Sequence, residues 1–251
     1  LTASADGEAS IKSITVERKG LADDAAFDSI ILLDEDGTQI GNSKTLSSEH
    51  KVVLNDSLKV AAGTSKTITI AGNMAASLDN YSGQGAKLAI VAVDAGSSAV
   101  NAALPIEGNG MTLNSNLSIG TVSMSLGSLD PGAANTKNVG TKGYYLASVK
   151  ASTGSAEDMI FEQIRFNQAG SAATSDLKNV LVKAGSTEYP AVASDDGKYF
   201  VAKFPGGLTV AKGANIEFSI KADLESGSSR TVDMDILKKS DIVAKGKVYG
   251  Y

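Results

Sequence analysis

Acidic loop residues are the first candidates for chemistry in this sequence. Asp34, Glu35 and Asp36 are consecutive, and Asp23 and Asp24 precede them. Ca²⁺ takes roughly six to eight oxygen ligands, which loop carboxylates can supply. The EF-hand spacing Asp-x-Asp-x-Asp-Gly with a later Glu is not present, so a solvated hairpin tip is the favoured interpretation. Asp34, Asp36, Asp23 and Asp24 remain Ca²⁺ candidates, and we predict no other cofactor.

Acid–base and nucleophilic chemistry have few candidate residues. His50 is the only histidine, and the chain contains no Cys and no Trp. No serine lies in a Gly-x-Ser-x-Gly turn, and nothing selects the pair of carboxylates that a glycosidase requires. We therefore predict that the chain is not an enzyme, and we interpret His50 as a surface loop residue.

Two further groups of residues suggest modification or assembly. Asn-x-Ser sequons occur at Asn55, Asn80 and Asn116, and such sequons become surface attachment sites in a secreted protein of an organism with N-glycosylation. Tyrosine rings suit contacts between subunits, with strand-face packing as the alternative. The predicted assembly residues are Leu1, Ile11, Tyr144, Tyr145, Tyr249 and Tyr251.

Composition excludes several classes of protein. The 251 residues are 42% hydrophobic and 20% charged, which is typical of a folded chain. The net charge is -5, and the basic residues are scattered, whereas a nucleic-acid partner requires clustered Lys and Arg. No apolar run approaches the roughly 18 residues needed to cross a bilayer. We predict no nucleic-acid partner and no membrane span.

Apolar residues alternate with polar ones in most hydrophobic segments. Ile68 and Ile70 share one face of the segment 65–70, and the segment 215–220 has the same pattern. This period of two predicts strands with one buried and one solvated face. Asp-Gly sequences at 34–37 and 195–197 predict hairpin tips. The fold class is therefore all-β.

The two halves of the sequence align when one is shifted by 150 residues. Val60, Gly63, Ile68 and Ile70, for example, align with Val210, Gly213, Phe218 and Ile220. Apolar positions and turn glycines are kept while polar identities are not, so the repeat preserves a fold rather than a site. It predicts a first β-sandwich at 1–113, a strand-bearing linker at 114–142 and a second β-sandwich at 143–251.

The repeat is asymmetric at its ends. The second copy is preceded by two strand-like runs at 121–126 and 144–149, for which the first copy has almost no counterpart. Each end of the chain therefore looks one strand short. Open sheet edges can accept a strand from another subunit, and head-to-tail addition produces a filament or lattice.

Four segments carry a resemblance to a known family. Residues 11–18, 28–34, 37–41 and 60–70 resemble tandem repeats of bacterial cell-surface proteins that form S-layer-like or filamentous structures. The resemblance implies immunoglobulin-like, Greek-key β-sandwiches, and usually no enzymatic activity. The second copy keeps the Val-Ala-x-Gly element at 210–213 but not the Gly-Thr-x-x-Gly turn. The resemblance supplies no ligand residues.

Together these observations predict a non-catalytic extracellular structural subunit. It is expected to assemble head to tail with copies of itself into a surface layer or filament, by strand complementation between subunits. The alternative is an adhesin or carbohydrate-binding sandwich module with a cell-surface glycan as partner. An aromatic-lined concavity on the loops would favour that alternative.

Overall fold

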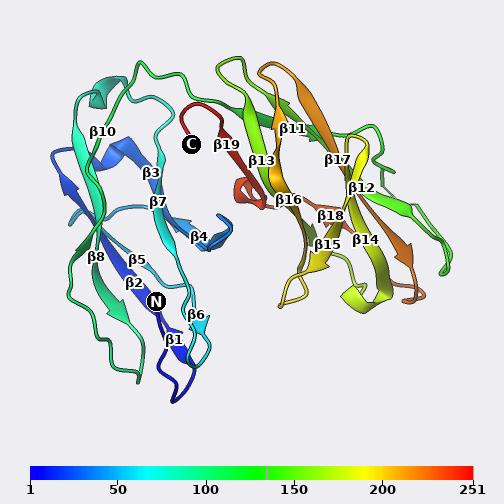
Figure 1. The fold of residues 1–251 in the computed structure, drawn as a ribbon, viewed down its shortest axis with the longest axis horizontal. Coiled ribbons are helices and arrows are strands. Elements are labelled where there is room, and N and C mark those ends of the chain that lie inside the picture. Colours follow the sequence, from blue (N-terminus) through cyan, green and yellow to red (C-terminus); the bar gives the residue numbers. More distant parts are fainter. Residues whose placement is uncertain (134, 251) are drawn as a thin grey trace. The chain divides into compact units, whose positions relative to one another are not determined.

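Strands dominate the structure, as the alternating pattern predicted. The computed structural model describes residues 1–133 and 135–250, and in them the helices are single 3₁₀ turns (Figure 1). The all-β prediction is confirmed. The chain divides into two compact units, Leu1–Leu117 and Ser118–Tyr251. No described helix is long and apolar enough to cross a membrane.

The first unit contains three antiparallel sheets. Their strand orders are β4-β3-β7, β10-β8-β2-β5 with β9 also on β8, and β1-β6. The strands are β1 (Ala9–Ile11), β2 (Ser13–Gly20), β3 (Phe27–Leu33), β4 (Gln39–Lys44), β5 (Lys51–Leu54), β6 (Leu58–Val60), β7 (Thr69–Met74), β8 (Gly85–Asp94), β9 (Ile106–Glu107) and β10 (Met111–Thr112). The 3₁₀ turns are η1 (Asp24–Ala26) and η2 (Asp79–Tyr81).

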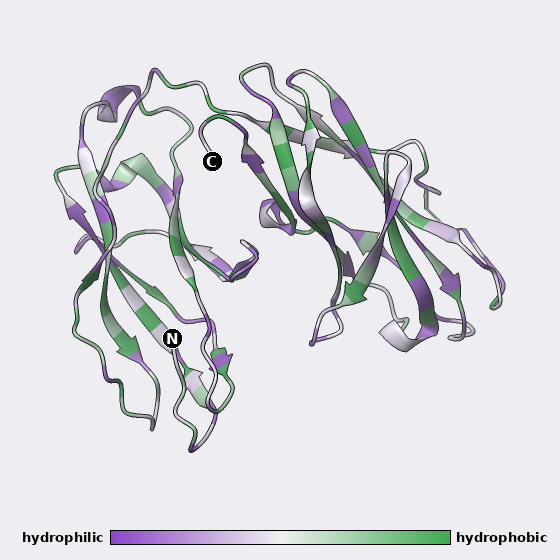
Figure 2. Cartoon of the chain, in the orientation of Figure 1, coloured by the Kyte–Doolittle hydropathy of each residue, from purple (hydrophilic) through white to green (hydrophobic). Residues whose placement is uncertain are grey.

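The core of the first unit is most deeply buried at residues of β2 and β3. Val16 and Ile30 have no exposed surface, and Ile14 is almost as deeply buried. Hydrophobic and polar segments follow each other along strands such as β8, as expected for sheets with one buried face (Figure 2). The predicted hairpin tip between β3 and β4 is confirmed, since Asp34 and Gly37 close it and Gly37 has a φ of 78°.

The second unit is a single nine-stranded network. Its order is β11-β12-β17-β14-β15-β16-β13-β18, with β19 also on β13. The strands are β11 (Val122–Leu126), β12 (Tyr144–Thr153), β13 (Met159–Gln168), β14 (Leu177–Ala184), β15 (Thr187–Ala193), β16 (Tyr199–Val210), β17 (Asn215–Leu224), β18 (Met234–Asp235) and β19 (Ile242–Gly246). The 3₁₀ turns are η3 (Thr174–Asp176) and η4 (Lys239–Asp241).

Strand β15 changes partner along its length. Residues 187–190 pair with β14, and residues 191–193 pair with β16. The core cluster of this unit draws on strands from both sides of that change. Phe161 of β13 and Phe204 of β16 each have ring centroids 5.4 Å from that of Phe218 on β17. These contacts are consistent with a β-sandwich whose two layers share one aromatic core.

Strand pairing in the two units matches at the spacing found in the sequence. Leu33 pairs with Thr69, and 150 residues later Lys183 pairs with Ser219. Phe27 and Met74 correspond in the same way to Leu177 and Leu224, and each pair of strands has one register shift within its first few residue pairs. The turns η1 and η3 also differ by 150 residues.

The range 114–142, expected to be a linker, contains a strand of the second unit. Strand β11 pairs with β12 over five residue pairs from Val122–Thr153 to Leu126–Val149. The boundary between the two compact units lies between Leu117 and Ser118, close to the start of that range.

Candidate functional site

Strand β7 forms one edge of its sheet, and β4 forms the other. In the order β4-β3-β7, strand β7 pairs with β3, and no strand among the described residues pairs with its other side. An edge strand presents backbone N–H and C=O groups that another chain can pair with. The first unit therefore has a potential strand-acceptor site at residues 69–74.

A groove of about 350 Å³ opens beside this edge. Its lining is mostly aliphatic and comes from both layers of the unit: Ile68 and Ile70 at β7, Leu88 and Ile90 of β8, and Ile106 and Met111 beyond them. Ile68 and Ile70 are only half-buried, although they pack against the core cluster. We call this feature the β7 groove.

The second unit shows what fills the equivalent place. Strand β17, which matches β7 at the 150-residue spacing, pairs with β14 on one side and with β12 on the other. Phe218 and Ile220, the counterparts of Ile68 and Ile70, are fully buried there. Ala147 and Ala151 of β12 are buried in the same cluster. Strand β12 therefore covers Phe218 and Ile220, whereas among the described residues no strand covers Ile68 and Ile70 in the same way.

The first residues of the chain pair with the segment just before β7, at the position that β12 takes beside β17. The Leu1 amino group donates to the Lys66 carbonyl oxygen at 2.9 Å, and the Lys66 N–H donates back to Leu1 at 2.8 Å. Thr2 forms an antiparallel bridge with Ser65. The pair Ser152–Asn215 of β12 and β17 lies 150 residues later. Leu1 and Thr2 thus pair in the register of β12, and in this antiparallel register residues 69–74 lie opposite positions that precede Leu1.

A second open edge lies in the other unit. Strand β11 begins the order β11-β12-β17-β14, so among described residues it pairs with β12 alone. Met124 and Leu126 lie opposite Ala151 and Val149 and therefore face the core side of the sheet. They are nevertheless 38% and 77% exposed. This edge, like β7, carries uncovered apolar side chains.

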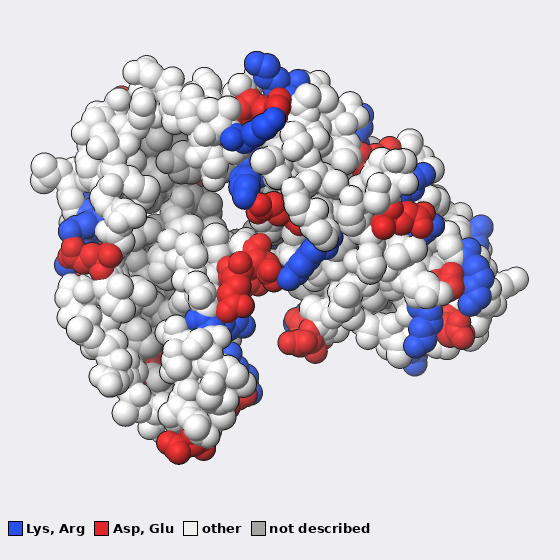
Figure 3. Space-filling view, viewed as in Figure 1, with Lys and Arg blue, Asp and Glu red and all other residues white. Residues whose placement is uncertain are grey.

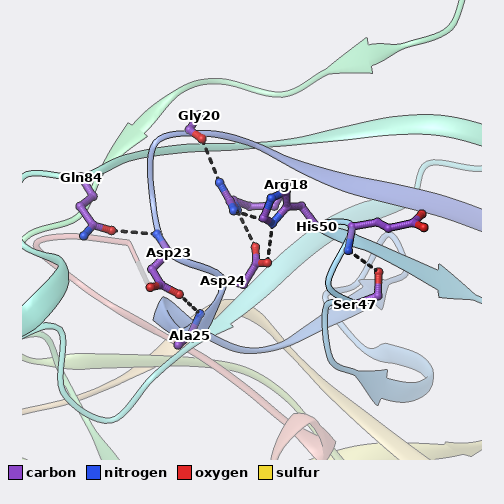
Figure 4. A network of polar contacts seen from close by, with 9 residues as sticks. Arg18, Gly20, Asp23, Asp24, Ala25, Ser47, His50 and Gln84 are labelled. Carbon is purple, nitrogen blue, oxygen red and sulfur yellow. Dashed lines mark hydrogen bonds and ion pairs between the residues drawn. The ribbon is translucent and has the colours of Figure 1, made fainter.

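His50 belongs to a polar cluster at the opposite end of β2 (Figure 4). Its Nδ1 lies 2.5 Å from Asp24 Oδ2, and the buried Arg18 donates from Nε to Asp24 Oδ1 at 2.7 Å. Because the Nδ1 proton is donated to the carboxylate, the Arg18 Nη2 atom 2.9 Å away is a contact and not a second donor to that nitrogen. Both Asp24 oxygens are therefore engaged.

Opposing effects act on the pKa of Asp24. Burial raises it, while the hydrogen bonds from His50 and Arg18 lower it, and the net result is a pKa below the ordinary value. Arg18 also donates to the Gly20 carbonyl oxygen at 2.9 Å. The cluster fixes the loop that contains η1, and it places the chain's single histidine, 54% exposed, at its rim.

The four Ca²⁺ candidates lie in two separate turns. Asp34 accepts hydrogen bonds from the N–H groups of Asp36 and Thr38 in the β3–β4 hairpin, and Asp23 caps η1 by accepting from Ala25. Asp24 belongs to the ion-pair cluster. The described residues contain no group of three or more acidic, His or Cys side chains arranged to hold a metal ion.

The predicted glycosylation sites are all exposed. Asn55 accepts a hydrogen bond from Lys44, Asn80 lies in η2, and Asn116 follows the last strand of the first unit. Their accessibility is compatible with modification, which stays a prediction.

The predicted assembly residues have different environments. Leu1 is 39% and Tyr249 45% exposed, and Tyr144 and Tyr145 are half-buried on β12. Ile11 instead belongs to the core cluster of the first unit with 7% exposure, so its side chain offers little surface to another subunit. Tyr251 lies outside the described residues.

Two carboxylates that sequence reasoning missed connect distant segments of the second unit. Glu157, 3% exposed, accepts hydrogen bonds from the N–H groups of Gly120, Val248 and Tyr249. Burial would raise its pKa, but these three donors lower it below the ordinary value. Asp176 likewise accepts from Ser226, Ala173 and Arg230, and its pKa is lowered. Except for Ala173, these partners are far away in the sequence, and no local pattern identifies them.

Comparison with known proteins adds nothing to this geometry. No protein-family model and no curated protein matches the chain. The candidate sites therefore rest on the residues themselves. Acidic and basic side chains are interspersed on the visible face, with wide uncharged areas between them (Figure 3).

Proposed function

We propose that this chain is a non-catalytic structural subunit of the cell exterior that assembles with copies of itself into a layer or filament. In this proposal its two units are tandem immunoglobulin-like, Greek-key sandwiches derived from one repeat. The shared strand register of β3–β7 and β14–β17 supports the repeat. The polymer is built from these sheets, and their surfaces supply the contacts.

The pair of open edges carries this proposal. Strands β7 and β11 each end a sheet among the described residues, and each has exposed or half-exposed apolar side chains on its core-facing side. Proteins that remain monomeric usually blunt such edges with charges, prolines or bulges. Two different edges on one chain permit a head-to-tail contact, which repeats without closing.

The polar networks favour a structural role as well. Glu157 and Asp176 use their oxygens to hold backbone N–H groups and neighbouring side chains. A catalytic carboxylate must instead present an oxygen to the substrate. The hydrogen bonds to Glu157 and Asp176 stabilise loops, and they explain why the pKa values of both acids are lowered.

The lining of the β7 groove bears on the alternative of a carbohydrate-binding module. The groove presents mainly isoleucine, leucine and methionine side chains, with Glu107 and Asn109 among the few polar ones. A sugar site needs several convergent polar groups and usually an aromatic platform. Aliphatic walls next to an unpaired strand are better suited to a peptide strand.

The oligomeric state of the purified chain tests the proposal. Sedimentation velocity and negative-stain electron microscopy should show concentration-dependent growth into regular filaments or sheets. The variant Leu21→Lys is the control for general stickiness, because Leu21 is 93% exposed but lies on neither edge. It should assemble like the unaltered chain. A chain that stays monomeric up to about 1 mM, the range of weak association, would overturn the proposal.

A further inference from the structure

Strands β9 and β10 form one interrupted strand along β8, at the end of the order β10-β8-β2-β5. Glu107 pairs with Ala89, and Met111 pairs with Ala86. Three residues separate Glu107 from Met111, but only two separate Ala89 from Ala86. The segment 108–110 therefore contains one extra residue, which is the arrangement of a β-bulge.

This bulge contains the chain's single Asn-Gly sequence, Asn109-Gly110. Both residues are exposed. The backbone nitrogen that follows an asparagine can attack the side-chain amide carbon, and glycine obstructs this approach least because it has no side chain. Every other asparagine of the chain is followed by a residue that carries a side chain. The bulge is thus the position where this ring closure meets the least steric hindrance.

The hydrogen-bond pattern leaves the Gly110 nitrogen free to react. The Leu113 N–H donates to the Gln84 carbonyl oxygen at 2.9 Å, across the ladder with β8. N–H groups alternate in direction along a strand, so the N–H of Gly110, three residues earlier, points away from β8. It donates no hydrogen bond to any described residue. No part of the fold has to open before this nitrogen can attack.

The Asp-Gly sequences at the two hairpin tips are held differently. The Gly37 N–H donates to the Asp34 carbonyl oxygen at 3.1 Å, and the Gly197 N–H donates to that of Ser194 at 2.8 Å. An aspartate can close the same ring with loss of water, but at these tips the turn hydrogen bond has to open first. The fold therefore restrains both hairpin tips and does not restrain Asn109-Gly110.

We propose that Asn109-Gly110 is a site of spontaneous covalent modification, at which the asparagine becomes aspartate or isoaspartate with water as the co-reactant. The Gly110 nitrogen forms a bond to Asn109 Cγ and loses its proton, and the side-chain nitrogen leaves as ammonia. One water molecule then opens the succinimide ring. Attack of water at Cγ gives aspartate, and attack at the backbone carbonyl carbon gives isoaspartate.

Both products change this edge of the first unit. Each adds a negative charge two residues after Glu107, whose carboxylate is already paired with Lys19 and Lys87. Isoaspartate also lengthens the main chain by one carbon atom between β9 and β10, so the pairing of Met111 with Ala86 has to shift or break. A charge on an edge strand opposes pairing with a further strand. The inference goes beyond the proposed function and does not depend on self-assembly.

Incubation of the purified full chain at neutral and mildly alkaline pH tests the inference. Peptide mapping by mass spectrometry in heavy-oxygen water identifies the converted residue, and electron-transfer fragmentation distinguishes isoaspartate from aspartate. Asn109 should convert faster than any other asparagine, and faster at higher pH because the Gly110 nitrogen has to lose its proton. The rate in the folded chain should lie within about threefold of the rate in urea, since no hydrogen bond has to open first.

Gly110→Val is the matched control. A Cβ at this position would meet no other atom within 4 Å, so the variant should fold, which circular dichroism verifies. Its branched side chain obstructs the backbone nitrogen, and conversion of Asn109 should become at least about tenfold slower. An unchanged rate in Gly110→Val would overturn the inference, as would a folded chain that converts more than about threefold slower than the unfolded one. Neither result bears on whether the chain assembles.

Discussion

Individual residues show how differently the two units complete their cores. Ile70 and Ile220 occupy matching positions on β7 and β17, yet Ile220 is fully buried and Ile70 is half-exposed. The same side chain therefore contributes differently to stability, because one copy of the strand is covered by β12 and the other faces the β7 groove.

Truncating these two isoleucines should reveal the difference. Ile220→Ala is expected to destabilise the second unit by about 3 to 4 kcal/mol, and Ile70→Ala should destabilise the first by about half of that, because fewer surrounding atoms lose contact. Hydrogen exchange of the full chain at increasing urea, read by peptide, measures each unit separately. Equal losses under monomeric conditions would contradict an open groove.

Glu157 links stability to pH through its three backbone donors. Its pKa is lowered in the folded unit, so its stabilisation is fully present above the ordinary value of 4.5 and is lost as the pH falls below it. Glu157→Gln should therefore reduce stability at neutral pH and flatten its acid dependence. Thermal unfolding between about pH 7 and pH 3 measures both effects.

The matched control is Glu162→Gln on β13. Glu162 is 42% exposed and forms a surface ion pair with Lys245, which should contribute little. This variant should retain the acid dependence of the unaltered chain. If both variants behave alike, the backbone donors around Glu157 are not the cause of the pH effect.

At the level of elements, the same strand can be internal or terminal. Strand β17 lies between β12 and β14, whereas β7 has β3 on one side only. Sequence periodicity identified the core-facing side of both strands, because alternation depends on local burial. It was wrong about Ser219, which lies on the predicted solvated face of β17 but is 2% exposed. It could not identify which strand is an edge, since that depends on pairing between distant parts of the chain.

Amide exchange should distinguish these two strands. In the monomer, alternate N–H groups of β7 point away from β3 and should exchange rapidly, while those of β17 should be protected throughout. NMR-detected hydrogen exchange at low concentration provides the measurement. Continuous protection along residues 69–74 in the monomer would show that the chain itself covers this edge.

For the whole molecule, the sequence predicted the class of fold, but it did not predict the long-range hydrogen bonds of Glu157 or the burial of Ile11. The all-β prediction is confirmed, and the strand register keeps the predicted 150-residue spacing. Glu157 escaped notice because its partners Gly120 and Val248 are 37 and 91 residues away. Ile11 was expected at a subunit contact but is buried, because strand β1 packs it into the core opposite Leu58.

The apolar edge strands determine how the proposed assembly should respond to salt. Charges of both signs are interspersed on the visible face, and the edges carry apolar side chains (Figure 3). Sodium chloride should therefore change the critical concentration little, while ammonium sulfate should lower it. Light scattering at several salt concentrations measures this. A steep loss of assembly in sodium chloride would instead indicate that ion pairs hold the subunits together.

The position of Glu157 also has a mechanical consequence. Its carboxylate holds Gly120 near the beginning of the second unit and Val248 and Tyr249 near its end. When tension is applied between the beginning and the end of this unit, we expect these three hydrogen bonds to bear load, because they connect the two through one side chain. The force needed to separate the two ends of the unit is therefore expected to depend on this single carboxylate.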